Sequence, residues 1–542
     1  HFKTVQGIET PRHDEAERIA GTDLDGHRRD LHGAIARGEC VALVGESGSG
    51  TSVTARALLG VAGANATVTA DRLRWHDDNL LELDERGWRR IRGRGISLVL
   101  QDALGSLDPL RRVGLEVAEP LVIHDLASGA TLRSEVIDLL DRVGVPEPEL
   151  RAKQYPHELS GGLRQRGLIA SAIAAGPDII IADEPTTALD VTVQARILEL
   201  LSTLKASGTG ILLISHDLAV VSRLADRVVV MRAGEVVESG TTSEVLTRPT
   251  AEYTRQLIGS IPSAGSRGRS LITGEALSRP TLEQDAAIVV EAVALRKRFR
   301  LGHGRDLVAV DDVSFTLAAG EVIGVVGESG SGKSTLGRLV LGLTEPDEGS
   351  VRVHGDDWSR VRGRERRRLR RRIQTVSQDP LGSFDPRFTV AKLLAEALPA
   401  LSNAERRRRS IELLESVGLG EAHLSRKPVT LSGGQRQRVA IARALAAEPE
   451  VLVCDEAVSA LDVTVQAQVL DLLEHLRVTT GVAMIFISHD IGVVQHIADR
   501  VLVMKDGRVV ESGDVDAVLG SPTHPYTRAL LAAVPTIPGE TL

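Results

Sequence analysis

The stretch VIGVVGESGSGKST, residues 322–335, decides the fold of this chain. It is a short apolar run that leads into a glycine-rich turn and then into Lys333, Ser334 and Thr335. The stretch VALVGESGSGTSV, residues 41–53, has the same form, but Thr51 stands where the other stretch has its lysine. An apolar run that ends in glycine is typical of a buried parallel strand. The sequence therefore predicts that the same α/β unit begins twice.

Both turns match the phosphate-binding frame G-x-x-x-x-G-K-[ST], except at Thr51. In this frame, backbone N–H groups and a helix N-terminus point at phosphate. Lys333 is expected to reach the β- and γ-phosphates of ATP, and Ser334 to bind Mg²⁺. Threonine is neutral and too short for the role of lysine, so we expect the first turn to bind nucleotide weakly. The predicted nucleotide-binding residues are Gly327, Glu328, Ser329, Gly330, Ser331, Gly332, Lys333, Ser334 and Thr335 (the second loop), and Gly45, Glu46, Ser47, Gly48, Ser49, Gly50, Thr51, Ser52 and Val53 (the first loop).

Further motifs repeat at a nearly constant offset. Gly45 and Gly327 are 282 residues apart (327 − 45), and Asp183 and Asp455 are 272 apart (455 − 183). A period of this size is that of a whole domain rather than of a solenoid repeat. We predict domains at residues 1–262 and 286–542. Residues 263–285 between them contain SAGSRGRS, a composition that suits a flexible, exposed linker.

Each half contains an apolar run that ends in two carboxylates. These pairs are Asp455–Glu456 in VLVCDE and Asp183–Glu184 in IIIADE. The aspartate of each pair is expected to bind Mg²⁺, and the glutamate to polarise the attacking water. The alternative is a solvated acidic strand end. Two such pairs at matching distances from the two loops favour the catalytic interpretation.

The composition excludes several other classes of protein. A chain of 542 residues is too long for one core, and its formal net charge of −8 gives no global basic bias towards nucleic acid. No apolar run has the length of a membrane span, so any membrane role is predicted to be peripheral. Cys40 and Cys454 lie in or beside apolar stretches and are expected to be buried thiols. Two arginine-rich stretches, residues 361–374 and 403–410, could bind anionic lipid or nucleic acid, but a solvated helical face is the favoured interpretation.

The segments LSGGLRQR (residues 159–166) and LSGGQRQR (residues 431–438) resemble the signature of ABC-transporter ATPases. The resemblance implies an α/β fold with two ABC-type P-loop NTPase domains in tandem. Each would have a RecA-like core, an antiparallel β part and a helical subdomain. It also implies that each ATP lies between the loop of one domain and the signature of the other. The signature residues are Ser160, Gly161 and Gly162 in the first half, and Ser432, Gly433 and Gly434 in the second.

The resemblance implies roles for further residues. Gln101 and Gln378 resemble the glutamine that senses Mg²⁺ or water, and His216 and His489 resemble the histidine that contacts the γ-phosphate. Phe299 and Phe2 resemble the aromatic residue that stacks on adenine, although Phe2 could equally be a core side chain. The site on Lys333 has every expected group and is predicted to hydrolyse ATP. The site on Thr51 keeps Ser52, Gln101, Asp183, Glu184 and His216 but lacks the lysine.

The end of the chain narrows the resemblance. SPTHPYTRALLAAVP (residues 521–535), with a weaker copy at 248–262, resembles the C-terminal element of the peptide-importer branch. This implies an ATPase on the cytoplasmic face of the membrane, bound to two transmembrane permease subunits and served by an extracytoplasmic substrate-binding protein. The alternative is a twin ATPase that acts on ribosomes, but such proteins join their domains by a long charged helical linker. A DNA-repair or chromosome-maintenance ATPase would need zinc-binding cysteines or long heptads, and the sequence has neither.

Overall fold

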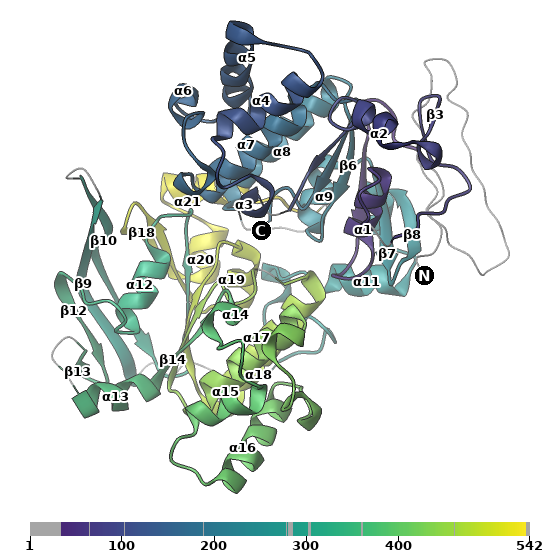
Figure 1. Ribbon diagram of the computed structural model, residues 1–542. Coiled ribbons are helices and arrows are strands. Elements are labelled where there is room, and N and C mark those ends of the chain that lie inside the picture. The colour runs from purple at the N-terminus through teal and green to yellow at the C-terminus, as the bar shows by residue number, and fades with distance from the viewer. Residues whose placement is uncertain are drawn as a thin grey trace. The chain divides into compact units, whose positions relative to one another are not determined.

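The computed structural model describes residues 34–63, 66–101, 103–187, 189–277, 279, 286–301, 305–358, 361, 363–459 and 461–537. Phe2 lies outside the described residues. The chain divides into two compact units, and Figure 1 colours it from purple at the N-terminus to yellow at the C-terminus. The first unit contains residues 1–189, 193–258 and 535–539, and the second contains residues 190–192, 259–534 and 540–542.

The first unit is built on a six-stranded sheet with the order β4-β5-β6-β1-β7-β8. All neighbouring strands are parallel except β7 and β8. Every residue of β1, β5 and β6 is buried, as expected for strands covered on both faces. The strands are β1 (Cys40–Val44), β4 (Ile96–Val99), β5 (Ile179–Asp183), β6 (Gly210–Ile214), β7 (Arg227–Arg232) and β8 (Glu235–Thr241). A small pair, β2 (Arg74–Trp75) and β3 (Asp78–Asn79), forms a separate ribbon.

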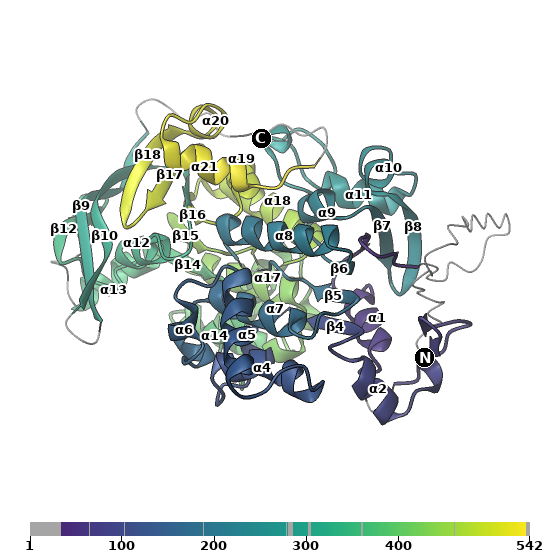
Figure 2. The same ribbon diagram turned by 90° about the horizontal axis from the view of Figure 1, so that it is seen from above.

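Helices cover this sheet and form a separate helical group. The helices α3 to α7 pack on one another, and α10 packs on β7 and β8 (Figure 2). The helices are α1 (Thr51–Leu58), α2 (Glu85–Ile91), α3 (Ala103–Ser106), α4 (Val113–Ile123), α5 (Gly129–Arg142), α6 (Pro148–Arg151), α7 (Gly161–Ile173), α8 (Val191–Ala206), α9 (Leu218–Leu224), α10 (Thr242–Thr247) and α11 (Glu252–Gly259).

The second unit repeats this architecture. Its six-stranded sheet has the order β14-β15-β16-β11-β17-β18, which is the same order in equivalent strands. The strands are β11 (Val322–Val326), β14 (Ile373–Ser377), β15 (Val451–Asp455), β16 (Ala483–Ile487), β17 (Arg500–Lys505) and β18 (Arg508–Asp514). A four-stranded antiparallel sheet, β10-β9-β12-β13, lies beside α12 (Figure 1). Its strands are β9 (Ile288–Leu301), β10 (Arg305–Ala318), β12 (Glu348–Val353) and β13 (Asp356–Asp357).

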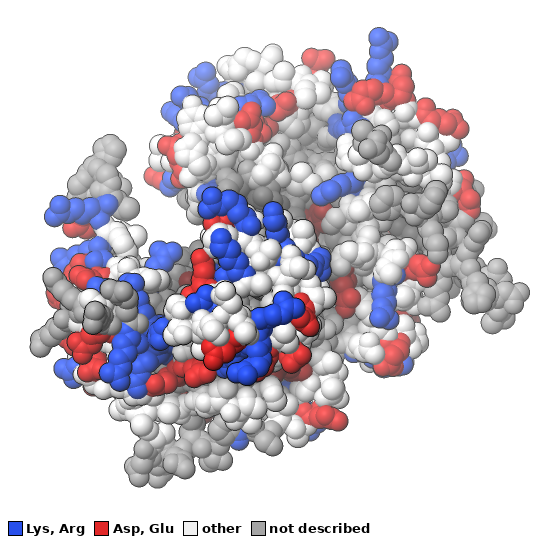
Figure 3. Space-filling view, turned by 60° about the horizontal axis from the view of Figure 1, so that its bottom comes forward, with Lys and Arg blue, Asp and Glu red and all other residues white. Residues whose placement is uncertain are grey.

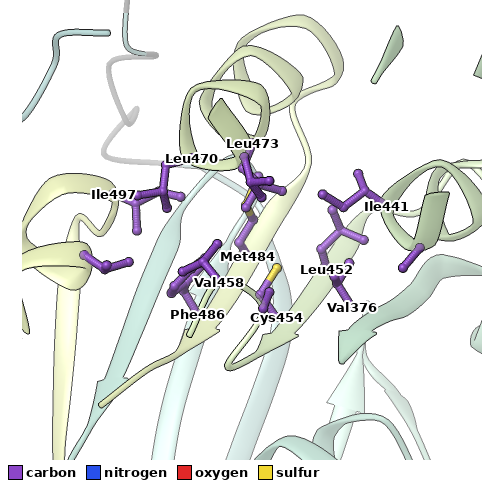
Figure 4. Packing of buried hydrophobic residues seen from close by; sticks show 14 of the residues in the cluster. Val376, Ile441, Leu452, Cys454, Val458, Leu470, Leu473, Met484, Phe486 and Ile497 are labelled. Carbon is purple, nitrogen blue, oxygen red and sulfur yellow. The ribbon is translucent and has the colours of Figure 1, made fainter. Parts of the chain in front are cut away.

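The core of the second unit lies between its sheet and its helices. In Figure 4, Leu470 and Leu473 from one helix lie over Met484 of the neighbouring strand, and Cys454 points into the same layer. Both cysteines are buried thiols, as expected, and burial raises the pKa of each to about 12. The helices are α12 (Lys333–Val340), α13 (Gly363–Arg372), α14 (Pro380–Ser383), α15 (Val390–Ala397), α16 (Asn403–Ser416), α17 (Gly433–Leu445), α18 (Val463–Thr480), α19 (Ile491–Ile497), α20 (Val515–Gly520) and α21 (Pro525–Ala533).

The predicted fold class is confirmed in both units. Each has a mostly parallel sheet with a glycine-rich loop between a central strand and a helix, and each has a helical group. The antiparallel β part is present in the second unit. In the first unit, the β2–β3 ribbon corresponds to the hairpin of β12 and β13. The residues before position 34 lie outside the described residues. Within the described ranges, no helix combines the length and the apolar character that crossing a bilayer requires.

The segment predicted to be an exposed linker lies instead against the second unit. Leu271 is buried, and its backbone N–H donates to Asp471 Oδ1 on α18 at 2.9 Å. Ser270 Oγ donates to the other carboxylate oxygen at 2.6 Å. Arg279 forms an ion pair of 2.6 Å with Glu474, also on α18. The acidic residues of α18 therefore hold part of the segment whose composition suggested a free connector.

The arginine-rich stretches form α13 and α16, and some of their arginines pair with acidic side chains. Figure 3 shows that basic and acidic side chains both lie on the face of the molecule that it presents. Arg372 pairs with Glu450 at 2.7 Å, and Arg409 with Glu412 at 3.1 Å. α13 still has seven arginines against one glutamate. The choice between a solvated helical face and a site for an anionic partner therefore stays a prediction.

Candidate nucleotide sites

The sheet order brings the predicted polar residues together at one edge in each unit. In the second unit, Gln378 follows β14, Asp455 ends β15, and His489 follows β16. These strands lie next to β11, from which the second loop leads into α12. The carboxyl ends of neighbouring parallel strands are where α/β sheets bind ligands. The first unit places Gln101, Asp183, Glu184, His216 and the first loop in the same way, after β4, β5, β6 and β1.

Lys333 lies inside the second loop. Only 6% of its surface is exposed, and Nζ donates to the backbone oxygens of Gly327 at 2.7 Å and Glu328 at 2.8 Å. Burial lowers the pKa of Lys333, while the charge of Glu456 opposes this shift. A cation held by carbonyl oxygens at the start of a helix fits an anionic phosphate group.

The loop geometry requires glycine at its two ends. A Cβ at Gly327 would lie 2.2 Å from the backbone oxygen of Met504, and one at Gly45 would lie 2.4 Å from that of Met231. Gly332 and Gly50 precede α12 and α1 with φ of 104° and 100°, in the left-handed region. Both loops therefore have glycine at a crowded first position and a left-handed last one, although only one has a lysine.

A hydroxyl and a carboxylate meet beneath each loop. Ser334 Oγ donates to Asp455 Oδ1 at 3.0 Å, and Ser52 Oγ donates to Asp183 Oδ1 at 2.9 Å. Burial raises the pKa of both aspartates, and the serine hydrogen bonds oppose the shift. Two hard oxygen ligands next to a phosphate-binding loop are a donor set that suits Mg²⁺. The residues present in both units therefore fit the cofactor.

The second carboxylate of the pair contacts a histidine and a glutamine in the second unit. Glu456 Oε2 lies 3.6 Å from His489 Nδ1 and accepts a hydrogen bond of 2.8 Å from Gln378 Nε2. The contact with His489 lowers the pKa of Glu456, against the effect of burial. Burial favours the neutral His489 ring, but the hydrogen bond and the charge of Glu456 raise the pKa of His489 overall. Glu456 is thus an ionised carboxylate that can accept a proton from water.

The equivalent carboxylate of the first unit is held more tightly. Glu184 Oε1 lies 2.7 Å from His216 Nδ1, and Oε2 accepts a hydrogen bond of 2.6 Å from Thr187 Oγ1. Burial acts to raise the pKa of Glu184, but the contacts with His216 and Thr187 together lower it. Gln101 is exposed. The first unit therefore keeps the carboxylate–histidine pair although its loop has Thr51.

Both catalytic candidates have an unusual backbone. Glu184 and Glu456 each have φ of 51°, the left-handed region that non-glycine residues rarely adopt. Their N–H groups donate to Ile214 and Ile487, both at 2.9 Å. Strain of this kind clusters at functional sites. The backbone therefore directs the two carboxylates in the same way.

The signature segments form helix N-termini. Ser160 caps α7 and Ser432 caps α17, and their Oγ atoms accept hydrogen bonds from the backbone of Leu163 and Gln435 at 3.4 and 3.2 Å. Ser160, Gly161, Ser432 and Gly433 are exposed. Exposed N–H groups at a helix start are available to an anion. That each signature segment binds the ATP held by the loop of the other domain stays a prediction.

Phe299 is placed on β9 with 38% of its surface exposed. Lys297 Nζ lies 5.9 Å from its ring centroid. A half-exposed ring is able to stack on a base. Its role as the adenine contact stays a prediction, and so does that of Phe2.

Two tyrosines that the sequence did not assign to a site touch the loops. Tyr526 Oη accepts a hydrogen bond from the backbone N–H of Glu328 at 3.1 Å, and Tyr253 Oη accepts one from Glu46 at 3.3 Å. The signal was present in the sequence, because the two tyrosines are 273 residues apart (526 − 253), like His216 and His489 (489 − 216). A shared offset alone, however, does not show which loop a side chain reaches.

Comparison with known proteins agrees with this geometry. The family model described as "ABC transporter" matches residues 29–187 and 310–459. The model described as "Oligopeptide/dipeptide transporter, C-terminal region" matches residues 237–286 and 510–542. Both models match twice, once in each half, as the offsets between motifs predict.

Two curated relatives match over nearly the whole chain. The glutathione import ATP-binding protein GsiA of Salmonella choleraesuis (strain SC-B67) is 42% identical over 98% of this chain and 89% of its own length. The oligopeptide transport ATP-binding protein OppD of Mycobacterium bovis (strain ATCC BAA-935 / AF2122/97) is 41% identical over 94% of this chain and 95% of its own.

A solved structure shares the fold. It is the complex of the archaeal ribosomal stalk protein aP1 and the archaeal ribosome recycling factor aABCE1, with a TM-score of 0.56 and 22% identity over 87% of this chain and 84% of that one. At this identity the likeness shows the fold alone. The two family models and the full-length relatives show more: this chain belongs to the ABC transporter family, as an ATPase whose two halves each end in an oligopeptide/dipeptide transporter C-terminal region.

Proposed function

We propose that this chain energises the import of glutathione-sized or longer peptides, and that ATP is hydrolysed mainly at the second loop. The observation that carries the asymmetry is Lys333. Its buried ammonium group lies among the carbonyl oxygens of the second loop, whereas the first loop has Thr51 at the same position. A charge-assisted hydrogen bond contributes about 1.5–3 kcal/mol, so its loss weakens ATP binding at the first loop.

The residues of the second unit divide the work of hydrolysis. Lys333 and the N–H groups of the second loop bind the phosphates of ATP, while Ser334 and Asp455 would hold Mg²⁺. That ion, when bound, neutralises charge that develops on the phosphates. Glu456 accepts the proton of the attacking water; His489 keeps its carboxylate ionised, and the hydrogen bond from Gln378 orients it.

The names of the relatives support the proposed transport role. GsiA is a glutathione import protein and OppD an oligopeptide transport protein, and both are ATP-binding proteins. We infer that this chain likewise works with transmembrane permease subunits on the cytoplasmic face of the membrane. A substrate-binding protein outside the membrane would then select the cargo. The family match of both C-terminal regions supports a peptide as that cargo.

Co-purification tests the transport role. The full chain, expressed from its own genetic neighbourhood and isolated by an affinity tag, is expected to bring down two hydrophobic membrane proteins. The complex, in proteoliposomes, should then show ATP hydrolysis stimulated by a binding protein loaded with peptide. Recovery of ribosomal subunits in place of membrane proteins would overturn the proposal and favour the ribosome-associated alternative.

The asymmetry is tested by matched substitutions in the two loops. Lys333→Ala should abolish most ATP hydrolysis, whereas Thr51→Ala should change it little, because Thr51 offers no ammonium group to lose. If Lys333→Ala retains wild-type turnover, ATP is not hydrolysed mainly at the second loop.

A further inference from the structure

The C-terminal region of each unit places a tyrosine hydroxyl on the glycine-rich loop. Tyr526 lies in the first turn of α21, and Tyr253 lies in the first turn of α11. Each hydroxyl accepts a hydrogen bond from the backbone N–H of the second residue of its loop: Tyr526 from Glu328, and Tyr253 from Glu46. The chain has three tyrosines, so two of them make the same contact in the two halves. This repetition points to a contact that serves the loop.

The contact holds one particular peptide unit of the second loop. This is the unit between Gly327 and Glu328: its N–H, from Glu328, donates to Tyr526, and its carbonyl oxygen, from Gly327, accepts from Lys333 at 2.7 Å. Gly327 lies so close to the backbone of Met504 that no side chain fits. The Gly327–Glu328 peptide unit is therefore fixed from both sides, by a neutral acceptor and by the ammonium group of Lys333. A carbonyl that orients Lys333 is part of the peptide unit that Tyr526 holds.

The tyrosine is itself held rigidly. Tyr526 is buried, and Lys505 Nζ lies 4.9 Å from its ring centroid. The turn before α21 is fixed to β18, because Glu511 accepts hydrogen bonds from the backbone of Thr523 at 2.7 Å and of His524 at 3.2 Å. Burial acts against the ionised form of Glu511, but hydrogen bonds from the side chains of Thr527 and Thr523, together with these backbone contacts, lower its pKa to about 2. The turn therefore stays attached to the strand at any physiological pH.

The hydroxyl is a stable acceptor for the same reason. Burial raises the pKa of Tyr526 to about 12, so the phenol stays neutral over the working range of the protein. A neutral acceptor satisfies the buried amide without placing a second negative charge beside the incoming phosphates. A carboxylate in this position would repel them.

We propose that Tyr526 is a positioning residue for ATP, which holds the Gly327–Glu328 peptide so that Lys333 and the loop amides meet the phosphates in a preformed arrangement. This assigns to the C-terminal region of the second half a direct part in nucleotide affinity. The inference rests on the proposed binding of ATP by the second loop. In the first half, Tyr253 makes the same contact on a loop without a lysine, where the position of that peptide matters less for phosphate binding.

The test is Tyr526→Phe in the full chain, which keeps the ring and removes the hydroxyl. We expect the KM for ATP to rise about 2- to 10-fold, the effect of one ordinary hydrogen bond, with a much smaller change in kcat. The matched variant Tyr253→Phe should raise the KM less. In a Thr51→Lys background, Tyr253→Phe should weaken ATP binding at the restored loop.

The possible outcomes separate the alternatives. If Tyr526→Phe lowers the urea midpoint of unfolding but leaves the KM unchanged, the tyrosine only packs the core and the inference is overturned. Equal effects of Tyr526→Phe and Tyr253→Phe would also contradict the assignment to the second loop. Lys333→Ala serves as the reference: if it retains wild-type ATP hydrolysis, the proposed function fails, independently of any result at Tyr526.

Discussion

Replacement of Thr51 by lysine is expected to turn the first loop into a tight ATP site. The surroundings of this position match those of Lys333. Ser52 meets Asp183 at 2.9 Å, as Ser334 meets Asp455 at 3.0 Å, and a tyrosine hydroxyl accepts a hydrogen bond from the second residue of each loop, Glu46 or Glu328. A lysine at position 51 is therefore expected to find the neighbours that Lys333 has.

The size of the effect follows from the contacts of Lys333. Its Nζ is held by two carbonyl oxygens at 2.7 and 2.8 Å and is almost fully buried, so little further ordering is needed when phosphate arrives. One charge-assisted hydrogen bond to phosphate contributes about 1.5–3 kcal/mol. This corresponds to ATP affinity about 10- to 150-fold higher at the first loop, at roughly 1.4 kcal/mol per factor of ten.

The assay is calorimetric titration of ATP into chains that cannot turn it over, with Glu184→Gln and Glu456→Gln in both. The chain with Thr51 should bind one ATP tightly, and the chain with lysine should bind two. Thr51→Met, similar in length but uncharged, serves as the control and should leave one tight site. Two equally tight sites in the chain with Thr51, or no gain from lysine, would refute the reasoning.

Three further predictions concern catalysis and stability. Glu456→Gln should reduce ATP hydrolysis by at least about 100-fold, which is the usual contribution of a general base. Glu184→Gln should reduce it by much less. Phosphate release measures both rates, and equal losses would contradict the asymmetric model. His496 is fully buried, and burial lowers its pKa from 6.5 to about 4, so the unfolded chain takes up the proton first. The contribution of His496 to the free energy of unfolding should therefore be constant above pH 6.5 and fall by up to about 3 kcal/mol as the pH decreases towards 4. Urea unfolding at a series of pH values measures this dependence, which His496→Gln should weaken. Arg279→Ala removes the ion-pair partner that lies 2.6 Å from Glu474, a carboxylate that is only 1% exposed. This change should destabilise the second unit by about 3 kcal/mol in urea unfolding. Arg269→Ala is the control and should have little effect, because the side chain of Arg269 is exposed.

The sequence was sufficient to predict residues whose partners are set by strand order. Ser334 and Asp455 are 121 positions apart, yet they meet because one follows β11 and the other ends β15 at the same edge of the sheet. Apolar runs and glycine-rich turns specify such strands and loops locally. Residues 193–204 and 465–476 follow the two carboxylate pairs, and their pattern predicts helices; both ranges lie within helices, α8 and α18.

Contacts that depend on a single side chain reaching a distant backbone were not predictable. Tyr526 is 198 positions from Glu328, and nothing local marks its hydroxyl as a partner of the loop. The composition of residues 263–285 likewise gave no sign that Asp471 would hold Leu271.

Small substitutions also escaped prediction. The same SHD motif gives a carboxylate–histidine distance of 2.7 Å in the first unit and 3.6 Å in the second. One difference is that Thr187 donates to the carboxylate of Glu184, whereas Ser459 donates to the backbone oxygen of Glu456.

The positive φ shared by Glu184 and Glu456 has a consequence for the history of the chain. A non-glycine residue in this conformation costs on the order of 1–3 kcal/mol, and the first unit still bears that cost at Glu184. Had its site been abandoned for long, glycine or a relaxed backbone at this position would have been favoured. A single substitution, at Thr51, would give the first loop the lysine that the second loop has.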